Sequence, residues 1–62
     1  MFSENLKYLR KLHKYTQSQL AEELLVNQRT ISDWENSISE PDLSMLLKIK
    51  ELFNESIDNL LE

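Results

Sequence analysis

The sequence predicts an all-α fold: five short helices packed as one compact bundle, a single domain over residues 1–62. Three observations lead to this prediction. Apolar residues recur at helical spacing in every segment, and nowhere do they alternate with the period of two that a half-buried strand requires. Glycine is absent and Pro41 is the only proline, so few positions interrupt a helix. The segments between the expected helices are short, as a compact helical domain requires.

The first two helices follow from capping and spacing. The first is expected from about Ser3, as its N-cap, to Lys14. Its apolar face would consist of Phe2, Leu6, Leu9 and His13. The second is expected to start at Thr16, because Thr16 and Gln19 have the spacing of a capping box. Its inner face would consist of Leu20, Ala21 and Leu24.

The third helix is expected to begin after Asn27, a favourable N-cap, and to end near Asn36. Its apolar side would consist of Ile31 and Trp34, followed by Ile38 beyond the helix end. The opposite side is polar over a wide arc and consists of Gln28, Arg29, Ser32, Asp33 and Asn36. A helix in so small a domain usually needs its surface for packing, so this polar side calls for a function.

The last two helices follow a turn that contains Pro41. Asp42 is expected to cap a fourth helix that runs to about Phe53, and Ser56 is expected to cap a fifth. The predicted inward residues of the fourth helix are Leu43, Leu46, Leu47 and Phe53. In the fifth helix, Ile57 and Leu61 are expected to cover the core rather than to form an interface.

The charge is distributed unevenly along the chain. The net charge of −4 and the pI of about 4.9, taken alone, argue against a nucleic-acid partner. Residues 1–32 carry five basic and three acidic groups, a balance of +2, whereas residues 33–62 carry two basic and eight acidic groups, a balance of −6. The N-terminal part can therefore present a basic face although the whole chain is acidic.

Several classes of site are absent from the sequence. There is no cysteine and only one histidine, His13, which excludes a disulfide framework and disfavours a metal site. No nucleophile–base set and no glycine-rich phosphate loop is present, so we expect no catalytic residues, no cofactor, no small-molecule substrate and no enzymatic activity. No secretory signal and no membrane-spanning run is found, and the cytoplasm is the expected compartment.

Two helices joined by a tight turn, the second with a polar outer side, have the arrangement of a helix-turn-helix. The stretches "TQSQLAEELLVNQRTISDWENS" and "PDLSMLLKIKELFNESIDNLL" resemble the phage-repressor/Cro-type helix-turn-helix family of transcriptional regulators. The resemblance extends from Leu6 to Leu61. It implies a lambda-repressor-like five-helix domain that places its third helix in the major groove of double-stranded DNA.

The resemblance also implies roles for individual residues. Four would face bases or the adjacent backbone: Gln28, Arg29, Ser32 and Asp33. Four would lie at phosphates: Gln17, Thr16, Asn36 and Lys11. Gln17 would also brace the amide of Gln28, and Arg10 and Glu35 would form a structural ion pair. The chemistry is suitable, because a glutamine amide matches adenine N7 and N6, and arginine binds guanine or phosphate.

The sequence departs from the family at its turns. Leu25, Lys14 and Ser37 stand at or near positions where the family often has glycine, which predicts left-handed backbone there at a cost of about 1–2 kcal/mol for a residue with a side chain. The turn "SISEP" carries Glu40 and no basic residue, although the family usually has a lysine or arginine at this turn. A weaker hold on phosphates is expected from this turn.

These observations favour a sequence-specific DNA-binding regulator, most simply a repressor that binds an inverted-repeat operator as a homodimer. The alternative is a helical protein-interaction module of the same fold without DNA binding, which the net charge and Glu40 favour. The polar side of the third helix could then be a solvated surface in which Arg29 and Asp33 form an i,i+4 pair. The lysines of the first helix could likewise serve solubility alone.

Overall fold

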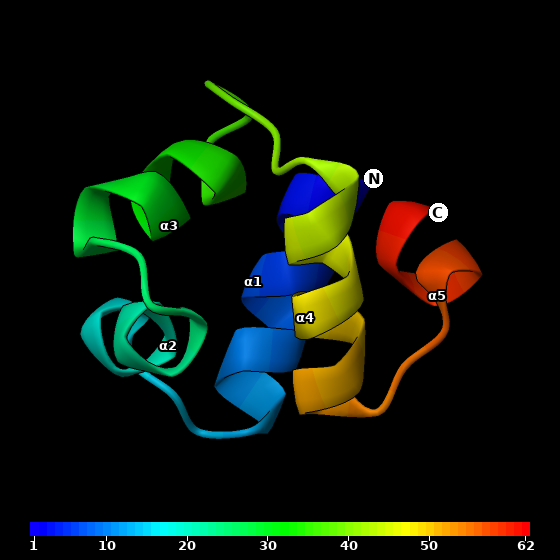
Figure 1. Cartoon of the computed structure of the whole chain (residues 1–62), viewed down its shortest axis with the longest axis horizontal. Coiled ribbons are helices and arrows are strands. Elements are labelled where there is room, and N and C mark those ends of the chain that lie inside the picture. Colours follow the sequence, from blue (N-terminus) through cyan, green and yellow to red (C-terminus); the bar gives the residue numbers. More distant parts are fainter.

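The computed structural model describes all 62 residues and contains five helices and no strand, which confirms the all-α prediction. The helices are α1 (Phe2–Leu12), α2 (Gln17–Leu24), α3 (Gln28–Glu35), α4 (Leu43–Phe53) and α5 (Ile57–Leu61). Helices α1 and α4 lie at the centre, α2 and α3 lie to one side of them, and α5 lies to the other (Figure 1). The longest helix has 11 residues, and none is long and apolar enough to cross a bilayer.

Side-chain caps fix the start of four helices, as predicted. Thr16 and Gln19 form both bonds of the capping box: the Gln19 amide donates to Thr16 Oγ1 at 3.0 Å, and the Thr16 amide donates to Gln19 Oε1 at 2.9 Å. The remaining caps are Asn27, Asp42 and Ser56, each of which accepts a backbone N–H three residues later. These local bonds define where α2 to α5 begin.

The bounds of α1 differ from the prediction. Its N-cap is Met1, without a side-chain bond, and Ser3 lies inside the helix. The Ser3 hydroxyl is instead buried and accepts a hydrogen bond from Ser37 Oγ at 2.9 Å, which ties the start of α1 to the turn after α3. The helix ends at Leu12 rather than at Lys14, because Lys14 has a left-handed φ of 62° that no α-helix can contain.

One core joins all five helices. It consists of Leu6, Leu9, Leu20, Ala21, Leu24, Ile31, Trp34, Ile49, Phe53 and Leu60. The core residues of α1, α2 and α3 were all predicted from the sequence. Of the other predicted residues, Phe2 is partly buried and packs against the core, whereas His13 lies just beyond α1 and is exposed. The His13 ring nevertheless lies 4.9 Å from the Phe53 ring, centroid to centroid, and so covers one edge of the core.

The inward orientation predicted for three residues of α4 and α5 is wrong. Leu43 and Leu47 are 67% and 45% exposed, and the fully buried residue of α4 is Ile49, with Phe53 one turn later. In α5 the buried residue is Leu60, whereas Leu61 is 48% exposed. Both helices carry neighbouring apolar residues, so the pattern does not define one stripe. The face is selected by tertiary packing: α4 packs against α2 and α5, and α5 packs against α1 and α4.

Ile38 is a further correction, since it is 71% exposed rather than inward. Helix α3 ends at Glu35, and Ser37 with a φ of 59° turns the chain away from the core. The left-handed backbone expected at Leu25, Lys14 and Ser37 is confirmed, with φ of 59°, 62° and 59°. Asn54, with a φ of 54°, is a fourth such residue, which was not predicted from the sequence.

Candidate nucleic-acid interface

The polar side of α3 is presented by a tight connection between α2 and α3. Helix α2 ends at Leu24, and α3 begins at Gln28. Leu25 adopts the left-handed conformation and Val26 donates its N–H to the Ala21 carbonyl, which closes the end of α2. Val26 then packs against the core, and Asn27 caps α3. The end of α2 and the start of α3 are therefore both fixed by local bonds.

A buried ion pair fixes α3 against α1. Arg10 Nε donates to Glu35 Oε2 at 2.6 Å, and Arg10 Nη2 donates to Glu35 Oε1 at 3.2 Å. The two side chains are 11% and 1% exposed, so the pair is almost wholly removed from solvent. Arg10 Nη1 also donates to the Tyr15 carbonyl at 2.9 Å, which ties the pair to the segment leading into α2. The ion pair expected between Arg10 and Glu35 is therefore present, with a third anchor that the side-chain pattern could not reveal.

Gln17, the first residue of α2, joins the same network. Its Nε2 donates to Glu35 Oε1 at 3.1 Å. The expected bond between Gln17 and the amide of Gln28 is not formed; the carboxylate of Glu35 takes that donor instead. A carboxylate is the stronger acceptor, and its position at the end of α3 brings it within reach of the start of α2.

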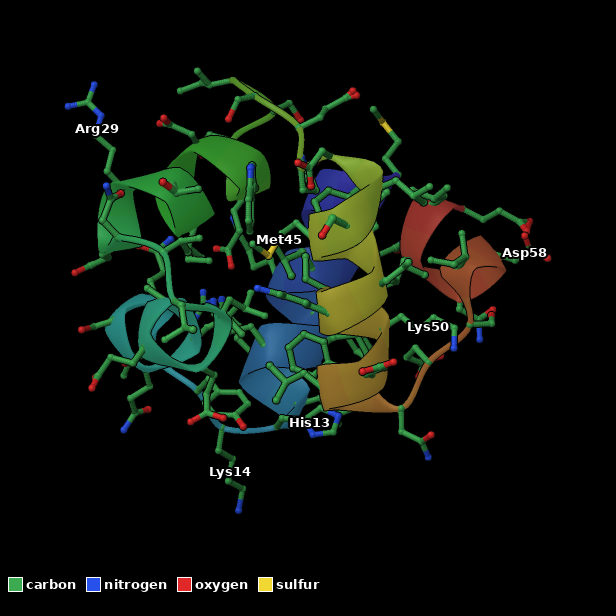
Figure 2. The ribbon with its side chains drawn as sticks, viewed as in Figure 1. His13, Lys14, Arg29, Met45, Lys50 and Asp58 are labelled. Carbon is green, nitrogen blue, oxygen red and sulfur yellow. The ribbon has the colours of Figure 1, made fainter.

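Gln17 and the polar side of α3 line one open hollow of about 490 Å³. Its lining consists of Gln17, Gln28, Arg29, Ser32 and Asp33. Gln28 and Arg29 are exposed, while Ser32 and Asp33 are half-buried. Arg29 extends away from the body of the molecule (Figure 2). All four residues predicted to face bases are thus brought together with Gln17.

The polar groups of this hollow are largely uncommitted. The side chains of Gln28, Arg29 and Asp33 form no hydrogen bond within the molecule. The i,i+4 pair between Arg29 and Asp33 is not formed, since the one ion pair of the structure joins Arg10 and Glu35. The surface therefore offers amide, guanidinium and carboxylate groups that remain free to bind an external partner.

The other three residues expected at phosphates lie outside this hollow. The Thr16 hydroxyl accepts the Gln19 amide as part of the capping box. Asn36 Nδ2 donates to the carbonyl and hydroxyl oxygens of Ser32 at 2.9 and 3.3 Å. Lys11 lies exposed on α1 and has no ion-pair partner. No group of His, Cys, Asp and Glu side chains in the structure could hold a metal ion.

A family model described as helix-turn-helix matches residues 6–60 of the sequence. The chain belongs to this family. The match covers all of α2 and α3 and all ten core residues, so it agrees with the phage-repressor/Cro-type resemblance on the same residues.

Known proteins support the family assignment. The chain is 42% identical over 60 residues to BcrR, an HTH-type transcriptional activator of Enterococcus faecalis; the match covers 97% of this chain but only 29% of BcrR. Its fold superposes with a TM-score of 0.92 on the P22 c2 repressor, solved in complex with a synthetic operator, at 32% identity over 100% of this chain and 94% of that one. The curated relatives are HTH-type transcriptional regulators.

The same fold also occurs within an enzyme. The hydroxypropylphosphonic acid epoxidase from S. wedmorenis matches 95% of this chain with a TM-score of 0.86 and 33% identity, but the match covers only 31% of the epoxidase. A fold shared by a repressor and part of an epoxidase does not define function on its own. Function has to be argued from the exposed side chains.

Proposed function

We propose that residues 1–62 form a DNA-binding unit that reads a specific sequence with α3 in the major groove of double-stranded DNA. One observation carries this proposal: a set of polar side chains, three of them without an internal hydrogen bond, lines an open hollow on a helix held by a buried network. Gln28, Arg29, Ser32 and Asp33 would face base edges. Gln28 suits adenine, Arg29 suits guanine, and Asp33 can accept from cytosine N4.

The rigidity of α3 supports this proposal. Base readout requires side chains to meet donors and acceptors at defined positions, so a helix that rotated or shifted would lose discrimination. The Arg10–Glu35 pair, the Asn27 cap and the buried Ile31 and Trp34 fix the rotation and tilt of α3. On the solvent side of this fixed helix, Gln28, Arg29 and Asp33 form no internal side-chain bond and stay available to base edges.

Phosphates would be held around this helix. The N-termini of α2 and α3 carry free backbone N–H groups and positive dipole ends. We propose that Gln17, Thr16, Asn36 and Lys11 contact phosphates, with Lys11 supplying a full positive charge. Phosphate contacts would fix the register of the domain, whereas the side chains of α3 would select the sequence.

We propose further that the protein acts as a repressor and binds an inverted repeat as a homodimer. One helix reads only a few base pairs, so a second copy on a half-site about 34–36 Å away would supply the missing affinity and specificity. The likeness to the P22 c2 repressor supports this assignment. A reporter gene placed under the selected operator would distinguish repression from the activation that the name of BcrR implies.

A protein-interaction module of the same fold remains the competing function. The net charge of −4 and the exposed Glu40, in a turn without a basic residue, favour it. The two functions differ in a direct test: the protein is incubated at low salt with a random duplex library, and bound sequences are selected. Enrichment of a two-fold symmetric site supports the proposed function. Failure to retain any duplex would favour the interaction module.

Gln28→Ala tests the assignment of α3 on the selected site. Loss of a bidentate contact should cost about 1–3 kcal/mol per half-site and flatten the preference at one adenine-containing position. Lys11→Ala is the matched control, since loss of a phosphate contact should weaken all sequences equally and lower the salt slope by about one ion per monomer. A Gln28→Ala variant that keeps the affinity and rank order of the parent would show that α3 does not read bases.

A further inference from the structure

Glu35 is the point where three helices meet through hydrogen bonds. Its carboxylate, 1% exposed, accepts three N–H groups: two from Arg10 of α1 and one from Gln17 of α2. Of these residues, only Gln17 also lines the hollow at the polar side of α3. A buried carboxylate on the third helix is thus connected to the candidate DNA surface through one neutral amide.

The bond leaves part of the Gln17 amide available. A glutamine amide has two N–H donors and an acceptor oxygen. In Gln17, one N–H is bonded to Glu35, and the structure gives the remaining donor and the oxygen no protein partner. Because the side chain is already held, little of its rotamer freedom would be lost on binding. A freely rotating glutamine would have to be ordered by the ligand itself.

The charge of the network suits a phosphate. An unpaired carboxylate behind Gln17 would repel an anion, and this repulsion would be strong in a site with little water. The bidentate bonds from Arg10 neutralise Glu35, so Glu35 orients Gln17 without opposing the phosphate. The side chain of Arg10 is only 11% exposed, and it lies outside the lining of the hollow.

We propose that Glu35, neutralised by Arg10, is a positioning residue that holds the Gln17 amide ready to donate to a DNA phosphate. This inference rests on the proposed function and adds a role for the ion pair beyond stability. The same hydrogen-bonded unit then has two roles: it holds α3 against α1, and it supports the phosphate contact at the start of α2.

Two matched variants separate positioning from stability. Arg10→Met with Glu35→Leu removes the ion pair and every acceptor for Gln17, whereas Arg10→Met with Glu35→Gln removes the same charges but keeps a carbonyl oxygen that Gln17 can reach. Replacement of a buried ion pair by residues of similar volume is often tolerated, and chemical denaturation checks this for both variants. If the leucine variant does not fold, Glu35→Asp, which withdraws the carboxylate by one methylene, replaces it.

The first measurement uses the free protein. In the ¹⁵N spectrum of side-chain amides, Gln17 should have dispersed, ordered signals in the parent and in the variant with Glu35→Gln, and averaged signals in the variant with Glu35→Leu. Gln28, exposed and unbonded, is the internal control and should be unchanged in all three. Gln17 signals that are already averaged in the parent, or that do not respond to Glu35→Leu, would overturn the inference whatever the protein binds.

The second measurement is a double-mutant cycle on the selected operator. Gln17→Ala should weaken binding about tenfold per half-site, as expected for one lost hydrogen bond to a charged oxygen. The leucine variant should lose the same factor, and Gln17→Ala added to it should cause no further loss. The glutamine variant should recover most of the affinity, and the rank order of sequences should not change.

The outcomes separate the inference from the proposed function. Losses that multiply, so that Gln17→Ala weakens the leucine variant by its full factor, would overturn the positioning role while the parent still binds DNA. A parent that binds no duplex would overturn the proposed function, and the inference with it.

Discussion

The two parts of this molecule are held together by different forces. In the first part, α1 to α3, buried polar bonds add to the apolar core: Arg10 and Glu35 pair, and Gln17 and the Tyr15 carbonyl bond to them. The second part is α4. No side-chain hydrogen bond joins α4 to another helix, and Ile49 and Phe53 hold it by apolar packing. Directional bonds fix the helix proposed to read DNA, whereas α4 needs only to cover the core.

Helix α5 is intermediate between these two cases. Leu60 is fully buried, and Asn5 Nδ2 donates to the carbonyls of Asn59 and Leu60 at 3.1 and 2.9 Å. The Met1 amino group also donates to the Glu62 carbonyl at 2.7 Å. These bonds fasten the end of α5 to the start of α1, so α1 forms polar bonds to both α3 and α5. Substitutions in each part should therefore differ in kind as well as in size.

The largest loss of stability is expected from Arg10→Met. The substitution leaves the carboxylate of Glu35 buried at 1% exposure without its cation, and such a change typically costs about 3–5 kcal/mol. Urea denaturation followed by circular dichroism measures it. Arg29→Met is the control, because Arg29 is exposed and unpaired and its loss should change stability by less than about 0.5 kcal/mol. Equal midpoints for Arg10→Met and the parent would show that the first part does not depend on this pair.

Ile49→Ala is the corresponding test of the second part. Ile49 is fully buried, and truncation of such a residue costs about 2–5 kcal/mol through lost burial and the cavity left behind. Leu47→Ala is the matched control two residues earlier, and with 45% of Leu47 exposed its loss should be clearly smaller. The ranking of the two variants by denaturation midpoint checks the orientation of α4. A larger loss for Leu47→Ala would restore the face predicted from the sequence.

Helices α3 and α4 also show what the sequence could and could not predict. In α3, polar residues surround a narrow apolar side, so Ile31 and Trp34 could face only the core. In α4 the stretch "LSMLLKIKELF" is apolar on most sides, and periodicity does not decide which residues face inward. Met45 of α4, which is half-buried and packs against the core, was not predicted for the same reason (Figure 2). Local caps were predictable because they depend on neighbours in sequence.

The candidate site was predictable in composition but not in its internal bonds. The polar residues of α3 share one side by helical spacing alone, and the four expected to face bases all line the hollow. The predicted partner of Gln17 was wrong. A long flexible side chain can reach either Gln28 or Glu35, and only the packing of α2 against α3 decides between them. The Tyr15 carbonyl could not be predicted, since a backbone oxygen leaves no mark in the residue pattern.

Leu25→Gly is expected to raise stability by up to about 1 kcal/mol. Leu25 has a φ of 59°, which costs a residue with a side chain about 1–2 kcal/mol, and its side chain is 85% exposed, so little burial is lost. The opposing term, the greater freedom of glycine in the unfolded chain, is about 0.5–1 kcal/mol. Thermal unfolding should give a higher midpoint for Leu25→Gly, and a lower one for the control Glu22→Gly inside α2. A lower midpoint for Leu25→Gly would mean that its side chain contributes packing that outweighs the strain.

The smallest effect is expected from Asn54→Gly, at the corresponding left-handed position after α4. Asn54 has a φ of 54°, but asparagine adopts this conformation at little cost because its short polar side chain can bond locally. The relief of strain should therefore only balance the entropy of glycine, and the change should stay within about 0.5 kcal/mol. Asn54→Leu, which recreates the situation of Leu25, should lower the thermal midpoint. If Asn54→Gly stabilised the protein as much as Leu25→Gly, the two turns would carry equal strain. Asparagine would then have no advantage over leucine at a left-handed position of this protein.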